Sequence, residues 1–297
     1  MQLSPAVRRL LDQHGLEASQ VDGTGRGGRV TAEDVERVAA SRTTKPISAD
    51  SAPPLSLRPT SHPPSGIPSR MVPHSQMRKG IAAHMVHSVA IAPHVTTVFD
   101  ADLSRVLLHR ERNRAEAEAR GAKLTLTAYF VRATVQALQA VPEVNSRWHD
   151  DALELFEDCN VGVATALDDG GLIVPVIREA QTLDLIGIAE RLSDLTSRAR
   201  AGALTPADVQ RGTFTISNHG VSGSIIATPI IINQPQSAIL GIGRMEKRVV
   251  VAQSYTHEIT EIRPMLYVTL TIDHRVLDGF LANKFLTEWV KTIQEWE

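Results

Sequence analysis

The segment Asp273–Gly279 holds the residue types best suited to chemistry: a histidine, His274, and an aspartate, Asp278, four positions apart. It follows a run, Met265 to Ile272, in which apolar residues alternate with polar ones, a pattern typical of a strand. Histidine has an unperturbed pKa near neutrality, so it can accept and return a proton at working pH. A histidine at the end of a buried strand is placed for proton transfer. A packed structural histidine is the alternative, because so short a pattern also arises by chance.

A second polar cluster, Ser217 to Gly220, ends the strand-like run 213–217. The Ser217 hydroxyl is a hydrogen-bond donor that could stabilise the oxyanion of a tetrahedral intermediate, an effect worth about 3–4 kcal/mol. A turn whose polar side chains satisfy backbone groups explains the same residues. The sequence leaves both interpretations open.

Two other chemistries fit poorly. A serine hydrolase would place its nucleophile in G-x-S-x-G, but Ser217 stands between Ile216 and Asn218. A metal site would need ligand spacings that the histidines at 84, 87 and 94 lack, and Cys159 is the single cysteine. We therefore expect neither a hydrolytic triad nor a metal.

Composition and charge limit which partners and which cellular location are expected for the protein. The 297 residues carry a net charge of −2, which gives no reason to expect nucleic acid or an acidic membrane surface as partner. Apolar runs are too short to cross a bilayer, and the first residues lack the features of a signal peptide. These observations predict a soluble cytoplasmic protein.

A change of composition divides the chain into parts. Residues 41–74 contain eight prolines and many serines, which predicts an extended, mobile linker. Residues 1–40 form a small domain before it, and residues 75–297 form a larger domain after it. In the larger domain, strand-like and helix-like runs do not alternate strictly, which indicates an α+β fold.

The small domain is predicted to contain two helices. Ser4 followed by proline starts the first helix, Gly15 ends it, and Thr31 with Asp34 starts the second. The loop between them contains G-x-G-x-x-G, but a dinucleotide site needs a preceding strand and a crossover unit, which have no room here. The arginines could meet an acidic partner surface; they are Arg8, Arg9, Arg26 and Arg29.

Several longer motifs resemble those of known protein families. SPAVRRLLDQHGL and VDGTGRGGRVTAEDV resemble the peripheral subunit-binding domain of 2-oxo acid dehydrogenase acyltransferases. FTISNHGVSGSIIATPIIINQPQSAILGIGRMEKR, PMLYVTLTIDHRVLDG, MRKGIAAHM and APHVTTVFDADLS resemble the catalytic domain of dihydrolipoamide acyltransferases, in family order. The resemblance implies a fold like that of chloramphenicol acetyltransferase, with trimers that build cubic or icosahedral cores.

For the site, the resemblance implies that His274 is the general base, that Asp278 holds the geometry of the site, and that Ser217 of an adjacent subunit donates to the oxyanion. The substrates would be coenzyme A and dihydrolipoamide, without a metal. Residues 1–40 would bind the decarboxylating dehydrogenase, dihydrolipoamide dehydrogenase, or both. A non-catalytic scaffold in the same complex is the alternative function, but such a protein would be expected to lose the histidine.

One part of the family pattern has no counterpart: a lipoyl domain does not fit before Ser4. The lipoyl group is therefore expected from a removed segment or from another chain. The motifs are similar to those of succinyl and branched-chain transferases, and acetyl transfer stays open. An antibiotic acetyltransferase of the same fold is disfavoured because it would have no use for a docking domain.

Overall fold

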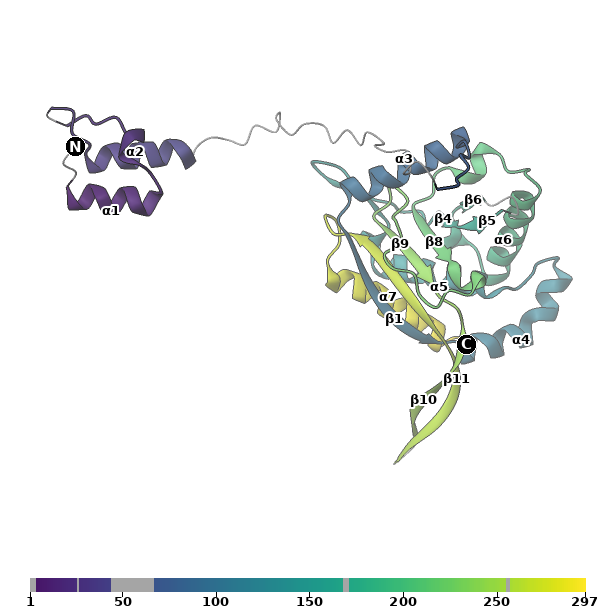
Figure 1. Ribbon diagram of the computed structural model, residues 1–297. Helices are drawn as coiled ribbons and strands as arrows, with labels where there is room; N and C mark the ends of the chain where they lie inside the picture. The colour runs from purple at the N-terminus through teal and green to yellow at the C-terminus, as the bar shows by residue number, and fades with distance from the viewer. Residues whose placement is uncertain (1–3, 26, 44–66, 168–170, 255–256) are drawn as a thin grey trace. The chain divides into compact units, whose positions relative to one another are not determined.

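The computed structural model describes residues 4–25, 27–43, 67–167, 171–254 and 257–297 (Figure 1). The chain divides into two compact units, Met1–Val72 and Pro73–Glu297. The finer boundaries at residues 40 and 75 stay a prediction, and most of the proline-rich segment lies outside the described residues. None of the helices in the described ranges has the length and apolarity needed to cross a membrane.

The small unit consists of α1 (Pro5–His14), the short 3-10 helix η1 (Ala18–Gln20) and α2 (Ala32–Thr43). The Ser4 side chain accepts a hydrogen bond from the backbone of Val7, and Gly15 ends α1 with a φ of 58°, a left-handed conformation that favours glycine. Its core is a single apolar cluster, made of Val7, Leu11, Leu16, Val21, Val30 and Val35. The predicted start and end of α1 are therefore both present.

The large unit mixes helices with strands. The helices are α3 (Gln76–Ile91), α4 (Ser104–Ala119), α5 (Leu126–Ala140), α6 (Leu185–Arg200) and α7 (Gly279–Gln294), with 3-10 helices η2 (Pro142–Val144), η3 (Ala180–Thr182), η4 (Pro206–Val209) and η5 (His219–Ser222). The strands are β1 (His94–Asp102), β2 (Ser146–Trp148), β3 (Leu153–Leu155), β4 (Val161–Val163), β5 (Thr165–Ala166), β6 (Leu172–Ile173), β7 (Val176–Ile177), β8 (Phe214–Asn218), β9 (Ala238–Ile242), β10 (Glu246–Ser254) and β11 (His257–Asp273).

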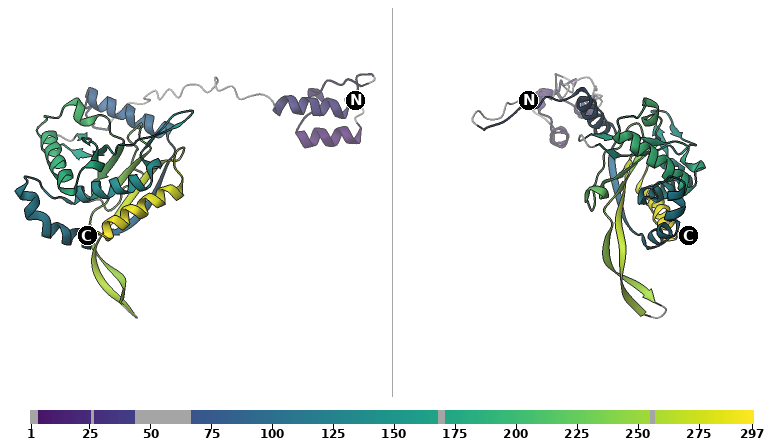
Figure 2. Two further views of the ribbon diagram at one scale, coloured as in Figure 1. Left: turned by 180° about the vertical axis from the view of Figure 1, so that it is seen from behind. Right: turned by 90° about the vertical axis from the view of Figure 1, so that its right-hand side faces the viewer.

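The main sheet has the strand order β1-β11-β9-β8-β4-β7, and β10 pairs with β11 outside this path. The pairs β4–β8 and β8–β9 are parallel, and the other pairs in this sheet are antiparallel. Helices α5 and α7 pack together beside the sheet (Figure 2). The main apolar core includes alternate residues of the central strands, such as Ile216, Leu240 and Leu270, and buried residues of α5 and α7. One face of the sheet is thus buried against helices.

The other face is more polar and is covered by the segment 219–236 and by α3. The Ser88 hydroxyl on α3 donates to the backbone oxygen of Ile232 over 2.7 Å, and His84 contacts Asn233 at 3.2 Å. Nε2 of His94, on β1, accepts from the backbone N–H of Ile232 at 3.0 Å. These bonds fix the covering segment to the sheet edge.

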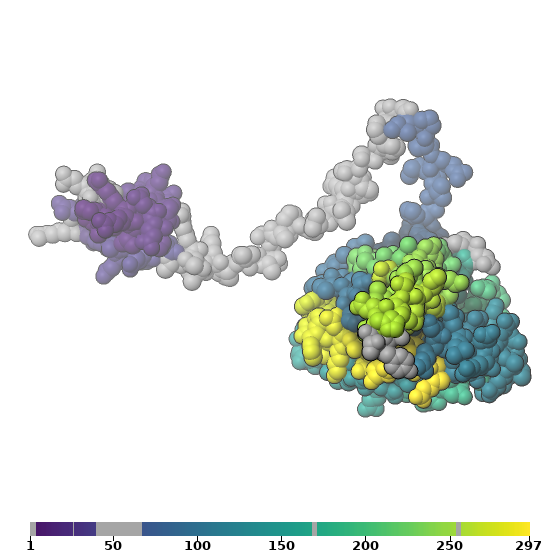
Figure 3. Space-filling model, turned by 90° about the horizontal axis from the view of Figure 1, so that it is seen from below, coloured from purple at the N-terminus to yellow at the C-terminus, as the bar shows by residue number. Residues whose placement is uncertain are grey.

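The largest difference from the sequence-based strands is β11, which starts at His257 rather than Met265. Its first half pairs with β10 and forms a two-stranded ribbon that extends away from the sheet (Figure 1, Figure 3). This half contains charged residues and Pro264, so its sequence lacks the apolar alternation that indicates a strand. Apolar side chains on the ribbon are largely exposed in the single chain: Val249, Val251 and Ile262 at 70%, 71% and 70%.

The short strands were also incompletely predicted. Strands β2 and β3 form a small hairpin that the sequence pattern did not indicate, because each contains only three residues. The predicted hairpin between 160–167 and 172–177 is present as antiparallel pairs of β4 with β7 and β5 with β6. The predicted turn is Asp168 to Gly171, and its first three residues lie outside the described residues.

Candidate active site

His274 lies in the first turn after β11. Its backbone N–H donates to the oxygen of Pro93 over 2.9 Å, which ties the turn to the segment before β1. The neighbouring Asp273 is buried and accepts hydrogen bonds from the backbone and side chain of Arg275. The His274 side chain is exposed, and among the described residues it has no hydrogen-bond partner. The backbone of the turn is therefore held firmly, while the imidazole is free to meet a substrate.

Asp278 is the N-cap of α7. Its Oδ1 accepts from the backbone N–H of Leu281 at 2.9 Å, a contact that satisfies one free donor of the helix and fixes where the helix begins. Leu277, just before it, is buried in the core. Arg275 pairs with Asp273, not with Asp278, and it lies over the Trp148 ring at 5.4 Å. In the single chain, Asp278 thus connects the histidine turn to α7.

Ser217 lies near the carboxyl end of β8, on the face of the sheet away from the main core. Its neighbour Ile216 belongs to that core, and successive side chains of a strand point to opposite faces. The Ser217 hydroxyl has no hydrogen-bond partner among the described residues, and the side chain is half-buried. A donor at this position is available for a ligand.

The strand register keeps Ser217 and His274 apart within one chain. Ser217 pairs with Gly241, and Gly241 pairs with Thr269, five residues before His274. With about 3.3 Å per strand residue and about 4.8 Å between strands, the two residues are roughly 15–20 Å apart. One thioester carbonyl cannot meet both side chains of the same chain. If both act on one substrate, they come from different chains.

His219, a half-buried residue whose ring nitrogens are buried, belongs to the polar cluster Ser217 to Gly220 but is not among the predicted site residues. Burial lowers the pKa of His219, and the backbone of Ser224 opposes this shift. Neither ring nitrogen has a hydrogen-bond partner of normal geometry in the described part of the chain, and the same holds for the hydroxyl of Thr269. Proximity to Ser217 is the only sequence signal that could have selected His219.

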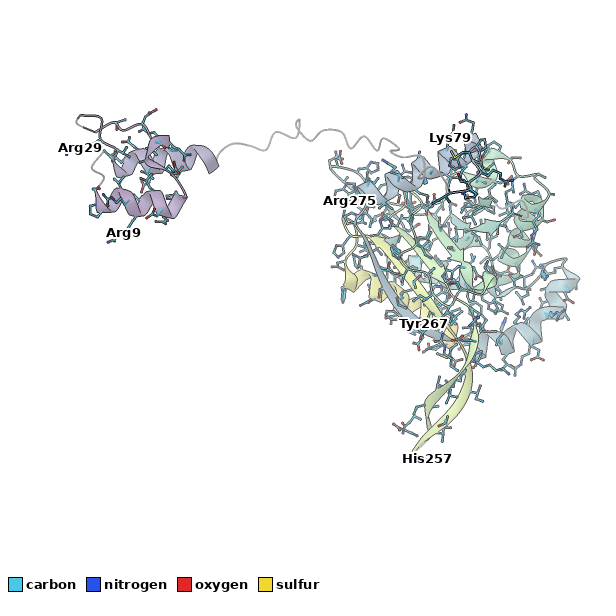
Figure 4. The ribbon with its side chains drawn as sticks, viewed as in Figure 1. Arg9, Arg29, Lys79, His257, Tyr267 and Arg275 are labelled. Carbon is cyan, nitrogen blue, oxygen red and sulfur yellow. The ribbon has the colours of Figure 1, made fainter. Side chains whose placement is uncertain are left out.

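The predicted partner-binding arginines belong to the small unit. Arg8 and Arg9 on α1 and Arg29 in the loop before α2 are exposed, and Figure 4 labels Arg9 and Arg29. Arg26 lies outside the described residues. Three exposed cations on so small a unit fit contact with an acidic surface.

The loop of the small unit is organised by Asp34. This buried carboxylate accepts from the backbone N–H groups and hydroxyls of Thr24 and Thr31, and it pairs with Arg37. The backbone of Thr24 is the first cause that lowers the pKa of Asp34. The glycine-rich loop therefore closes on the protein's own carboxylate, which supports a structural role for its glycines.

Metal ligands do not gather anywhere in the ranges that the structure describes: no group of three or more histidine, cysteine, aspartate or glutamate side chains could hold an ion. His84 and His94 are engaged by Asn233 and by backbone groups instead.

With the site's geometry established, comparison with known proteins gives the family. Residues 68–297 match the family described as 2-oxoacid dehydrogenases acyltransferase (catalytic domain), and residues 1–36 match an E3 binding domain. The chain belongs to this acyltransferase family. The predictions of an acyltransferase and of an α+β catalytic domain after a small two-helix subunit-binding domain are confirmed.

Curated relatives of this acyltransferase span nearly the whole chain. It is 36% identical over 304 residues to the lipoamide acyltransferase component of the branched-chain alpha-keto acid dehydrogenase complex of Bacillus subtilis, covering 98% of this chain and 70% of that one. It is also 36% identical over 293 residues to the dihydrolipoyllysine-residue succinyltransferase component of the 2-oxoglutarate dehydrogenase complex of Rickettsia bellii, again with 98% and 70% coverage.

Solved structures are similar to the catalytic unit of this acyltransferase. A probable dihydrolipoamide acetyltransferase of Listeria monocytogenes has a TM-score of 0.72 at 35% identity, covering 77% of this chain and 97% of that one. Azotobacter vinelandii dihydrolipoamide acetyltransferase, studied for a serine, a histidine and an asparagine in its catalytic mechanism, has 0.72 at 28%, covering 79% and 96%. The cubic core of a pyruvate dehydrogenase multienzyme complex has 0.71 at 28%, covering 82% and 96%.

Proposed function

We propose that this protein moves an acyl group between dihydrolipoamide and coenzyme A, as part of the core of a 2-oxo acid dehydrogenase complex. Family membership supports the acyltransferase class, and relatives named for lipoamide and dihydrolipoyllysine support the acceptor. The observation that carries the site assignment is the turn after β11, which fixes the backbone of His274 and leaves its imidazole exposed.

The proposed reaction is a direct exchange between two thiols. Neutral His274 takes the proton from the coenzyme A thiol, because the thiolate is the nucleophile. The thiolate attacks the carbonyl carbon of the acyl-dihydrolipoamide thioester, and the Ser217 hydroxyl donates to the oxyanion that forms. Collapse breaks the bond to the lipoyl sulfur, and the leaving thiolate recovers the proton from the imidazolium. Acyl-coenzyme A and dihydrolipoamide are the products, and no covalent acyl-enzyme is needed.

The same three positions are supported by the Azotobacter vinelandii enzyme. Its named histidine and asparagine stand four positions apart, as do His274 and Asp278 here, and its serine precedes that histidine in the chain as Ser217 precedes His274. We propose that Asp278 acts through the backbone, since it starts α7 directly after the histidine turn.

The separation of Ser217 and His274 within one chain supports a shared site. We propose that each site uses His274 of one protomer and Ser217 of its neighbour, in a homotrimer that assembles into a larger core. A cubic core among the similar structures supports the assembly. The exposed apolar side chains of the β10–β11 ribbon are compatible with further burial between chains.

The small unit supports a docking role alongside catalysis. We propose that residues 1–40 bind the decarboxylating dehydrogenase, dihydrolipoamide dehydrogenase, or both, through Arg8, Arg9 and Arg29. The match of residues 1–36 to an E3 binding domain supports this proposal. The lipoyl substrate would be presented by a lipoyl domain.

The direct test of the base is His274→Ala, assayed with dihydrolipoamide and acyl-coenzyme A. Because a general base contributes about 10²–10⁴-fold, we expect kcat to fall at least 100-fold. His87→Ala, a histidine on the exposed side of α3, serves as the matched control and should keep full activity. Near wild-type turnover of His274→Ala in an intact core would remove His274 from the mechanism. Acetyl-, succinyl- and isobutyryl-coenzyme A, compared in the same assay, identify the acyl group.

A further inference from the structure

Three residues form a row across the polar face of the sheet. Ser217 on β8 pairs with Gly241 on β9, and Gly241 pairs with Thr269 on β11. Paired residues of neighbouring strands project to the same face, so all three lie on the side away from the main core. The proposed oxyanion donor therefore has a glycine beside it and a second hydroxyl one strand further.

Thr269, Ile230 and His219 surround the space that a side chain on Gly241 would occupy. A Cβ on Gly241 would lie 2.3 Å from Oγ1 of Thr269, 2.4 Å from Cδ1 of Ile230 and 3.5 Å from Nε2 of His219. The imidazole and the threonine hydroxyl thus approach the same point, directly beside Ser217. His219 follows Ser217 by two positions, and the chain leaves the strand between them at Asn218, whose φ is −89° and ψ 82°.

The atoms of this cluster have hydrogen-bonding capacity that the single chain does not use. Among the described residues, both ring nitrogens of His219 and the Thr269 hydroxyl are buried without a hydrogen bond of normal geometry, although the backbone of Ser224 lies near enough to raise the pKa of His219. Burial, not a neighbouring charge, is the main reason that the pKa of His219 is lowered, so the ring is neutral near pH 7. A neutral imidazole offers one donor and one acceptor. Buried polar groups are normally satisfied, so three such atoms around one point call for an explanation, and a hydrogen-bonded role beside Ser217 supplies one.

We propose that His219 is a positioning residue for Ser217. One ring nitrogen accepts a hydrogen bond from the Thr269 hydroxyl, and the N–H of the other donates a hydrogen bond to Oγ of Ser217, directly or through one water. An N–H donated to Oγ turns the serine proton away from the ring, toward the reacting carbonyl, where it can stabilise the oxyanion. Hydrogen bonds in such a chain also polarise one another, which strengthens the last donor. This inference rests on the proposed role of Ser217.

The test is a double-mutant cycle on the full-length assembled protein. His219→Phe keeps a ring of similar size but removes both nitrogens, and we expect kcat to fall about 10-fold, the effect of one hydrogen bond in the transition state. The KM for coenzyme A should change less than about two-fold, because the lost bond acts only as the oxyanion forms. In a Ser217→Ala background, His219→Phe should have almost no further effect. His219→Gln, which retains a donor and an acceptor, should restore most of the activity.

His109→Phe is the matched control. Burial also lowers the pKa of His109, which bonds Tyr129 at 2.8 Å near α7, so this substitution should alter stability without altering kcat. Full kcat in His219→Phe, or an equal loss with and without Ser217, would overturn the positioning role. If Ser217→Ala itself has no effect, the proposed site fails instead. If His219→Phe does not assemble, Thr269→Val replaces it in the same double-mutant cycle. A fall in kcat that disappears in the Ser217→Ala background supports the chain of hydrogen bonds. A fall in kcat that is additive with Ser217→Ala refutes it.

Discussion

At the scale of single residues, the candidate site has a hydrogen-bonded backbone and two side chains without hydrogen-bond partners in the described ranges. Asp273 is buried and bonded to Arg275, and the backbone of His274 is bonded to Pro93, while the His274 and Ser217 side chains have no partner among the described residues. A side chain without a partner on a fixed backbone can bind a substrate without first breaking a hydrogen bond. Their positions at strand ends made both groups candidates in the sequence, and the family resemblance implied their roles, which stay a prediction. The sequence could not reveal the row Ser217–Gly241–Thr269, because that row depends on the pairing of distant strands.

Cys159 provides a test of burial at this scale. Burial, with a smaller contribution from Asp158, raises the pKa of the Cys159 thiol to about 11. Compared with an ordinary thiol of pKa 9.0, the thiolate population at pH 8 is roughly 100-fold lower. We expect alkylation by iodoacetamide to be at least that much slower in the folded protein than in guanidinium chloride. As Cys159 is the single cysteine, mass spectrometry reports it directly. Equal rates in both states would contradict the packing around β4.

At the scale of elements, caps and turns were predicted better than long-range pairing. Ser4 and Gly15 bound α1 as expected, because their effect is local to the helix ends. The first half of β11 was missed, because its pairing with β10 compensates for Pro264 and for charged side chains that weaken the apolar pattern. Local signals define the ends of helices, whereas tertiary pairing decides how far a strand extends.

Asp34 is the residue on which the small unit depends most. Asp34→Asn removes charge-assisted bonds to Thr24 and Thr31, so hydrogen exchange in α1 and α2 of the full-length protein should become faster. Asp12→Asn, at an exposed position of α1, should leave exchange unchanged. Because the pKa of Asp34 is lowered on folding, its contribution is present above the unfolded pKa near 3.8 and is lost as pH falls below it. Unchanged protection in Asp34→Asn would show that the loop is held by other contacts.

At the scale of the whole molecule, the two units match two different kinds of domain. The larger unit matches the acyltransferase catalytic domain and carries the proposed site residues, and the smaller one carries the match to an E3 binding domain. In the single chain, Ser217 and His274 lie on opposite ends of the central strands. The position of each residue was predictable from sequence, but their separation followed only from the strand register. Catalysis by both residues therefore requires assembly.

Subunit mixing tests this central claim most directly. His274→Ala and Ser217→Ala chains, each nearly inactive alone, are co-expressed in equal amounts and purified as one core. If each site takes its histidine and serine from adjacent protomers, random assembly in cyclic trimers gives about a quarter of the sites both residues, and activity should recover to about a quarter of wild type. A mixed core that stays as inactive as its parents would show that both groups act within one chain, and would contradict the shared site.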